Sequence, residues 1–449
     1  MLQVVSRREL RPFAVIWLGQ VASLVGSALT GFALGVWLFQ RSGAVTDLAV
    51  NALCATLPMA VLSPLAGALV DCHDRRLLMI ASDCAAAIVT LIIGLLALGG
   101  GLQAWHVYAS TALIATLNAV QGPAYLATVA LLVPKEHLGR TSGMTSLAYA
   151  SASIVAPALG GALLVTVGLA GVIAIDLVTF LLAAVSLLVV PIPRPPTAGQ
   201  RVRRSYWRDV AAGWGYIGAH PGLLGMTLYF AALNLAEGMG NVLRAPLVLS
   251  FAPPTALGAV MSAAGAGGLA GGLLMSVWGG PRRRVHGLLG FSAPAGLCMV
   301  LAALRPSVAL LGAAYAGRYV CGPVFSGCAT AIQQSIVAPE MQGRAFALGS
   351  AVRGATLTLV YLAAGPLADG VFEPLMAVGG RLSGSAGAMI GAGPGRGIAL
   401  LMGLLGLFTV GVALAGRLYP RLYRIEDESA AQRHGPDTAR PVHAVAAEV

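Results

Sequence analysis

The sequence contains very little charge. Asp, Glu, Lys and Arg together make up 10% of its 449 residues, whereas a soluble domain carries about 25%. Hydrophobic residues make up 57%, and the mean hydropathy is +0.81. So few charged groups cannot cover a globular surface of this size in water. The composition therefore excludes an ordinary soluble enzyme and predicts that most of the outer surface faces lipid.

Several chemical motifs are also absent. The sequence has no Gly-x-x-x-x-Gly-Lys-(Ser/Thr) phosphate loop, which excludes ATP-driven pumping by this chain. Its six cysteines form no Cys-x-x-Cys pair and fall mostly within apolar stretches, so we expect neither disulfides nor a metal site. The histidines show no spacing of a metal cluster or a nucleophile and base. We therefore expect no cofactor, and we rank a membrane-embedded enzyme or receptor as the less favoured alternative.

The charge that is present is mostly positive. The formal net charge is +11 at pH 7, and Lys135 is the only lysine among 28 basic residues. A nucleic-acid-binding protein gathers such residues on one solvated face, interleaved with aromatic residues. Here they lie between apolar stretches, so we expect no nucleic-acid partner.

Long apolar stretches dominate the rest of the sequence. Each is long enough to cross a hydrocarbon core of about 30 Å as a helix, and none shows the alternating pattern of a barrel strand. We therefore predict an all-α membrane protein with twelve transmembrane helices, at about residues 12–39, 46–70, 76–98, 105–132, 142–166, 169–191, 222–250, 255–278, 285–304, 307–335, 344–370 and 397–418.

One long polar segment divides these helices into two groups of six. We predict an N-terminal six-helix bundle (1–192), a basic cytoplasmic linker (193–221), a C-terminal six-helix bundle (222–418) and a disordered cytoplasmic tail (419–449). Most basic residues fall on the side of the linker and the termini, and only four fall on the other side: Arg41, Arg305, Arg381 and Arg396. This bias predicts that both termini are cytoplasmic. We expect a monomeric, multi-pass protein of a bacterial inner membrane.

The two halves share a weak repeat. Asn118-x-x-x-Gly122-Pro123-x-Tyr125 corresponds, at an offset of about 200 residues, to Arg318-x-x-x-Gly322-Pro323-x-Phe325. Parallel repeats of six helices are typical of transporters whose substrate site lies between the halves. The lipid bilayer and a small-molecule substrate are therefore the expected partners.

A charged motif follows the second predicted span. Gly67-x-x-x-Asp71-x-x-x-Arg75-Arg76 resembles the loop signature of the major facilitator superfamily, although Cys72 and Asp74 depart from it. The resemblance implies the twelve-helix fold of that superfamily and transport by alternating access. It also implies a conformational latch across the two halves, formed when the cytoplasmic side is closed, with Asp83 as a relay partner. The residues of this predicted latch are Gly67, Asp71, Asp74, Arg75, Arg76 and Asp83.

The fifth predicted span carries a second motif. Ala152-x-x-x-Ala156-Pro157-x-x-Gly160-Gly161 resembles the antiporter motif of the same superfamily, with alanine at two glycine positions. Small residues let helices approach closely, and a proline bends the helix. In that family the motif is typical of exporters. Chance small-residue spacing in a glycine-rich membrane helix is the alternative.

The motifs resemble one branch of the superfamily in particular. Together with Trp17-x-Gly19-Gln20 and Ile175-Asp176-x-x-Thr179-Phe180, they are similar to macrolide efflux proteins and the enterobactin exporter. The resemblance implies proton-coupled export of a small amphipathic compound, either a siderophore or a macrolide-like drug. Asn118 stands where the proton-antiporter motif has arginine. This departure keeps open the alternative of a permease or symporter that imports a small metabolite.

Charged residues within the spans are costly, and therefore informative. Counting about 1.5 Å per residue, Glu237, Arg318 and Arg353 lie near the middle of their helices. We hypothesise a hydrated cavity in which Glu237 accepts protons and Arg318, Arg353 and Arg244 bind an anionic substrate group. The alternative is a buried Glu–Arg network that ties helices together. Asp176 is a second candidate for proton coupling.

Polar and aromatic residues within the spans complete the candidate substrate site. Each could line a cavity, and core packing explains each of them equally well. These residues are Asn118, Gln121, Tyr125, Asn234 and Tyr229.

Overall fold

The computed structural model describes residues 11–191, 214, 215, 217, 218, 221–337 and 339–423. Within these ranges the protein contains helices and no strands, as predicted. The long helices of the first half are α1 (Arg11–Ser42), α2 (Val45–Cys72), α3 (Arg75–Leu98), α4 (Ala104–Leu132), α5 (Leu138–Thr166) and α6 (Gly168–Val189). Those of the second half are α8 (Pro221–Leu249), α9 (Pro254–Trp278), α10 (Arg284–Leu304), α11 (Val308–Ile336), α12 (Pro339–Leu367) and α15 (Arg396–Leu418).

Each predicted span coincides with one long helix. In the described part of the chain, eleven of these twelve long helices are long and apolar enough to cross a membrane. The remaining one, α8, has 29 residues and carries Glu237 and Arg244. Helices are expected here because a backbone in lipid must satisfy its own hydrogen bonds. The largest shift in a boundary is at α12, which begins at Pro339 rather than near residue 344, since proline is readily accepted in the first turn.

Short elements lie at the helix ends. They are the 3-10 helix η1 (Lys135–His137), the π-helix η2 (Ala368–Phe372) and the α-helices α13 (Glu373–Met376), α14 (Ala386–Ile390) and α16 (Pro420–Tyr423). The turn α16 falls in the segment that we predicted to be a disordered tail. Residues 424–449 and nearly all of the predicted linker lie outside the described residues.

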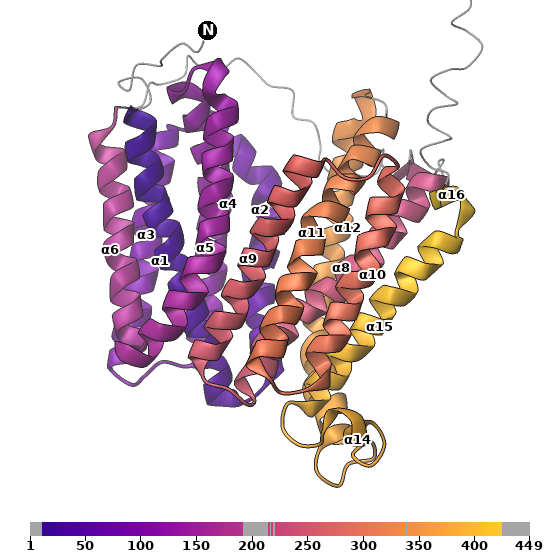
Figure 1. Cartoon of the computed structure of the whole chain (residues 1–449). Helices are drawn as coiled ribbons and strands as arrows, with labels where there is room; N and C mark the ends of the chain where they lie inside the picture. The colour runs from indigo at the N-terminus through magenta and orange to yellow at the C-terminus, as the bar shows by residue number, and fades with distance from the viewer. Residues whose placement is uncertain (1–10, 192–213, 216, 219–220, 338, 424–449) are drawn as a thin grey trace, which may run out of the picture.

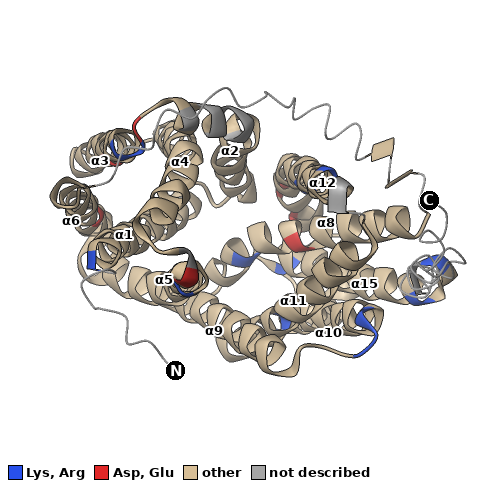
Figure 2. Ribbon diagram, turned by 90° about the horizontal axis from the view of Figure 1, so that it is seen from above, with Lys and Arg blue, Asp and Glu red and all other residues tan. Residues whose placement is uncertain are grey.

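The helices form two groups that stand side by side (Figure 1). Helix α5 of the first half packs against α9 of the second half, and α2 packs against α12. The first described turn of α1 and the last of α15 lie at one end of the molecule, which we call the terminal end, and α14 marks the opposite, distal end. Seen along the helices, charged segments are sparse among uncharged ones (Figure 2). That the terminal end faces the cytoplasm stays a prediction.

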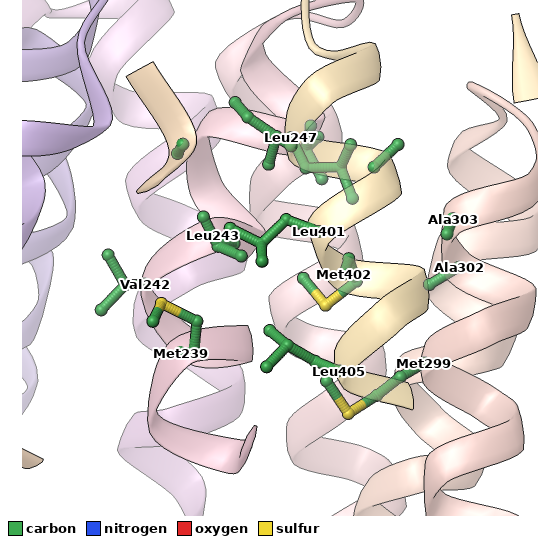
Figure 3. Close-up of a cluster of buried hydrophobic side chains, with 14 of the residues drawn as sticks. Met239, Val242, Leu243, Leu247, Met299, Ala302, Ala303, Leu401, Met402 and Leu405 are labelled. Carbon is green, nitrogen blue, oxygen red and sulfur yellow. The ribbon is translucent and has the colours of Figure 1, made fainter. Parts of the chain in front are cut away.

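A large apolar core holds α8 in place within the second half. Met239, Leu243 and Leu247 of α8 pack with Met299 of α10 and Met402 of α15 (Figure 3). The approach is close, because a Cβ added at position 240 would lie 2.9 Å from the Met299 Cε. This packing fixes the orientation of α8, and so determines where its two charged side chains point.

Candidate functional site

The two halves meet tightly where α5 crosses α9. A Cβ added at Gly258 of α9 would lie 2.3 Å from the Pro157 carbonyl oxygen, and one at Gly161 of α5 would lie 2.8 Å from the Pro254 carbonyl oxygen. The Ser262 hydroxyl also donates a hydrogen bond to the Ile154 carbonyl oxygen, at 2.6 Å. The backbones of α5 and α9 are thus in direct contact over the distal part of both helices, and only glycine fits at these positions.

The predicted helix-packing motif lies along this contact. Ala156 is buried, Pro157 provides the carbonyl that Gly258 approaches, and Gly161 abuts the start of α9. Gly160 faces the first half instead, where a Cβ would lie 2.8 Å from the Phe32 ring. The motif therefore serves two interfaces, one between the halves and one with α1.

A second contact between the halves lies at the distal end of α2. The Asp369 carboxylate of η2 accepts hydrogen bonds from the backbone N–H groups of Val45 and Thr46, at 3.0 and 2.8 Å, and from the Thr46 hydroxyl, at 2.7 Å. Gly365 of α12 packs directly against Thr46. An acid of the second half thus caps the first turn of a helix of the first half.

A cavity of about 700 Å³ lies between the halves, next to the contact of α5 with α9. Among the described residues that line it, Arg244 is the only charged one. The Arg244 Nη1 donates a hydrogen bond to the Tyr319 hydroxyl at 3.0 Å, and this hydroxyl in turn donates to the Asn241 Oδ1 at 2.9 Å. The lining residues come from both halves: Leu24, Ala28, Gly31, Phe32, Tyr149, Ala150, Ala152, Ser153, Ala156, Pro157, Arg244, Met261, Ala264, Gly265, Gly268, Leu269 and Tyr319.

A smaller cavity of about 150 Å³ adjoins the first and lies within the second half. Glu237 of α8 and Arg318 of α11 both line it, and Gly268 and Tyr319 line both cavities. Arg318 is buried, with its Cζ 5.7 Å from the centre of the Tyr319 ring. Among the described residues, the side chains of Glu237 and Arg318 form no ion pair or hydrogen bond. In this conformation the acid and the arginine share a cavity wall without pairing, and the alternative Glu–Arg network is not formed.

Arg353 lies apart from this pair. It lines a third cavity of about 470 Å³, with Asn234 and Thr227 of α8, Gln333 of α11 and Thr56 of α2 among the other lining residues. Arg353 is exposed, and no other residue in the described part of that lining is charged. The structure therefore divides the predicted arginine set among three cavities.

Besides Gln121, three predicted substrate residues are missing from the described linings of these three cavities. Tyr229 is buried, and its hydroxyl is hydrogen bonded to that of Ser292. Tyr125 packs against two apolar clusters of the first half. Asn118 is exposed on α4. The structure does not bring these side chains together with the arginines: Asn118 and Tyr125 belong to α4 of the first half, and Tyr229 is buried against Ser292 of α10.

Gln121 and Asp83 form a separate polar cluster. The Gln121 amide donates to Asp83 Oδ1 at 2.6 Å, and the Gln20 amide donates to Asp83 Oδ2 at 3.2 Å. The Gln121 amide also lies 3.2 Å from the Gln20 Oε1. Asp83 is only 1% exposed. The cluster joins α1, α3 and α4, so Gln121 is engaged inside the first half rather than facing one of the three cavities.

Asp176, the second proton-coupling candidate, also lies outside the three cavities. It is 1% exposed, and its Oδ1 accepts hydrogen bonds from the hydroxyls of Ser27 and Thr179, at 3.3 and 3.4 Å. A Cβ at Gly26 would lie 2.8 Å from the same oxygen. Asp176 therefore sits in the packed contact between α1 and α6.

The two arginines of the predicted latch bind within the first half. Arg75 donates to the Ala127 carbonyl oxygen of α4 at 3.2 Å. Arg76 donates to the carbonyl oxygens of Leu187 and Leu188, at 2.8 and 2.7 Å, where α6 ends. Asp74 caps α3 by accepting from the Arg76 N–H at 3.0 Å. The structure does not describe the surroundings of Gly67 or the side chain of Asp71.

Sequence reasoning passed over two residues that the structure makes prominent. Tyr319 contacts both Arg244 and Arg318. Its position directly after Arg318 in the repeated motif is the sequence feature that could have indicated a role in the site. Asp369 joins the two halves. An acid at the end of a predicted span is the sequence feature that could have indicated this contact. Neither signal alone specifies the partner.

Comparisons with known proteins agree with this architecture. The family description "Major Facilitator Superfamily" matches residues 16–360. Macrolide efflux protein A of Streptococcus pyogenes is 26% identical over 363 residues, which cover 80% of this chain and 89% of the relative. Multidrug efflux pump Tap of Mycolicibacterium fortuitum is 26% identical over 370 residues, with the same coverage of 80% and 89%.

Solved structures show the same fold. A bacterial homolog of the human lysosomal transporter Spinster, in an inward-facing and unoccupied conformation, has a TM-score of 0.67 at 15% identity, covering 96% of this chain and 99% of that chain. A mutant of the nucleoside transporter NupG has a TM-score of 0.68 at 11% identity, covering 90% and 99%. With a family match over most of its length and, among the described residues, twelve long helices in two packed halves, the chain belongs to the Major Facilitator Superfamily.

Proposed function

We propose that this membrane transporter is a proton-driven exporter of a small amphipathic compound, working as a monomer in a bacterial inner membrane with both termini in the cytoplasm. Relatives named for macrolide and multidrug efflux support export. A macrolide-like drug and a siderophore are the two candidate cargoes. The observation that carries the proposal is that Glu237, which forms no ion pair or hydrogen bond with the described residues, lines the same cavity as Arg318, and that this cavity adjoins the larger one between the halves.

The pairing state of Glu237 gives the coupling its physical basis. As a carboxylate, Glu237 attracts the guanidinium of Arg318 across the cavity, and in a region of low dielectric this attraction is strong. When Glu237 takes up a proton the attraction ends, and Arg318 is free to change its partner. A proton can favour one conformation over another only through such a difference between states.

The contacts between the halves suggest which conformation this is. The close contacts of Gly258 with Pro157, of Gly161 with Pro254 and of Asp369 with Thr46 involve the distal parts of the helices. If the terminal end faces the cytoplasm, the protein is closed to the outside. Export then requires these distal contacts to separate while the terminal ends approach each other.

Transport by purified protein in proteoliposomes tests the proposal. We expect a pH gradient to drive movement of a macrolide or a siderophore by the wild type, and Glu237→Gln to abolish the dependence on the gradient while exchange without a gradient persists. Glu136→Gln, which changes an exposed acid outside the cavities, is the matched control. Unchanged proton-coupled efflux by Glu237→Gln would exclude Glu237 as the coupling residue. Uptake in place of efflux would favour the importing permease.

A further inference from the structure

We propose that the cavity of about 700 Å³ between the halves binds an amphipathic anion, with its apolar body against α1, α5 and α9 and its carboxylate on Arg244. This inference rests on the proposed function, because it assumes that the cavity lies on the transport path. It goes further by stating which chemical class of cargo the cavity accepts. The argument depends on the size of the cavity, its single charge and the unused hydrogen-bond donors of that charge.

The cavity has the size and lining of a ligand site. Its volume falls within the range of about 300–1,000 Å³ that is typical of pockets for drug-sized ligands. Leu24 and Phe32 of α1, in the first half, and Met261 and Leu269 of α9, in the second half, provide apolar surface. A ligand held here contacts both halves at once, so its binding is coupled to their relative position.

Arg244 has hydrogen-bonding capacity that the protein does not use. A guanidinium carries five N–H donors, and the only hydrogen bond that Arg244 makes to the described residues is the one from Nη1 to the Tyr319 hydroxyl. Its Nε is buried without a partner in the described chain. The Cζ lies 5.7 and 5.9 Å from the ring centres of Tyr315 and Tyr319, which hold the guanidinium in place. Buried donors of this kind normally find an acceptor.

The local charge favours an anion over a cation. The described residues that line the cavity include no acid. The acid on the adjoining cavity, Glu237, lies seven residues before Arg244 on α8, which is about 10 Å along the helix. Arg318 adds a second positive charge on that side. Two cations against one acid in a cleft with apolar walls give a positive potential, and a carboxylate on a guanidinium forms a strong, charge-assisted hydrogen bond.

Binding measurements without a proton gradient test this inference. The protein is placed in lipid nanodiscs and titrated with dansylated undecanoic acid or with its primary amide, and the signal from empty nanodiscs is subtracted. We expect the acid to bind the wild type roughly tenfold or more tightly than the amide, as expected for a hydrogen bond to a charged group. Arg244→Gln should remove this preference and Arg244→Lys should retain part of it. Arg305→Gln, which changes an exposed arginine outside the cavity, should behave as the wild type.

A second variant keeps the test informative if Arg244→Gln does not fold. Ala28→Trp fills the apolar part of the cavity and should weaken binding of the acid and the amide alike. Equal affinity of the wild type for the acid and the amide, or a preserved preference in folded Arg244→Gln, would overturn the inference. Failure of the proposed function gives a different result: proton-coupled efflux would be lacking in the wild type or unaffected by Glu237→Gln, while the preference for the acid remained.

Discussion

Asp369 and Thr46 are joined by two hydrogen bonds across the two halves of the protein, from the Thr46 backbone N–H at 2.8 Å and from its hydroxyl at 2.7 Å. The Val45 N–H adds a third bond to the same carboxylate, at 3.0 Å. Because α2 begins at Val45, the acid also interacts with the positive end of the helix dipole. This contact has to break whenever the distal ends of α2 and α12 separate, so it stabilises the conformation seen here relative to the opposite one.

Replacement of Asp369 should shift the conformational equilibrium. A hydrogen bond to a charged group contributes about 1.5–3 kcal/mol, so Asp369→Ala should increase the population that is open at the distal end by tenfold or more. Thr46→Val, which removes only the hydroxyl, should have a smaller effect. Spin labels at Trp105 and Val378, both exposed, would report the distance between the halves in a variant without native cysteines.

The control for Asp369 is another acid at the same end of α2. Asp47 interacts with Tyr108 of α4, inside the first half. Asp47→Ala should therefore leave the distance distribution unchanged. Equal distributions for Asp369→Ala and the unsubstituted protein would show that the capping contact does not hold the distal end closed.

The close contact of Gly258 between α5 and α9 leads to a second prediction, about how well these helices pack after substitution. Gly258→Ala places a methyl group where only 2.3 Å separates it from the Pro157 carbonyl oxygen, and such overpacking costs about 1–3 kcal/mol. A disulfide between cysteines introduced at Ile154 and Ser262 should form in lower yield in this variant. Gly272→Ala on the same helix is the matched control, because a Cβ there meets nothing within 4 Å. Similar yields in the two variants would contradict the close contact.

The buried Asp83 should matter for the stability of the first half. Asp83→Ala leaves the amides of Gln20 and Gln121 without their acceptor, and we expect a loss of about 3 kcal/mol in the free energy of unfolding. Asp83→Asn keeps an acceptor oxygen and should lose less. Thermal unfolding in detergent measures the difference, with Glu136→Ala as the control on an exposed acid. If Asp83→Ala unfolds at the same temperature as Glu136→Ala, the cluster contributes little to stability.

The helices could be predicted from the sequence because the physics of the membrane is local. A backbone in lipid has to be helical, and an apolar run of sufficient length shows where. The same reasoning predicts Glu237 and Arg318 as candidate site residues, because charged side chains stand out within apolar runs, and the structure places both in the lining of one cavity. Tyr229 and Gln121 show the limit of this reasoning. A polar side chain in a span either lines a cavity or bonds a neighbouring helix, and the sequence does not specify which face it occupies.

Contacts between the two halves could not be predicted from the sequence, because they join residues that are far apart along the chain. Asp369 and Thr46 lie 323 residues apart, and no local pattern links an acid at the end of one span to the start of another. The close approach at Gly258 could not be predicted from the sequence either. Many glycines of this sequence have free space around them, and only the packed structure shows which do not. Sequence reasoning found the small-residue motif in α5, but not the residue of α9 that it faces.

Substitution of Arg76 distinguishes a structural role within the first half from a role as a latch between the halves. In this conformation its guanidinium binds the carbonyl oxygens of Leu187 and Leu188, where a cation compensates the negative end of the α6 dipole. Arg76→Ala should therefore lower the free energy of unfolding by about 1–2 kcal/mol, and Arg76→Lys should restore part of it. Thermal unfolding of the two variants measures this, and spin-label distances across the terminal ends measure the latch. A change in those distances without a change in unfolding temperature would show that Arg76 acts between the halves, since its contacts with α6 would then contribute nothing.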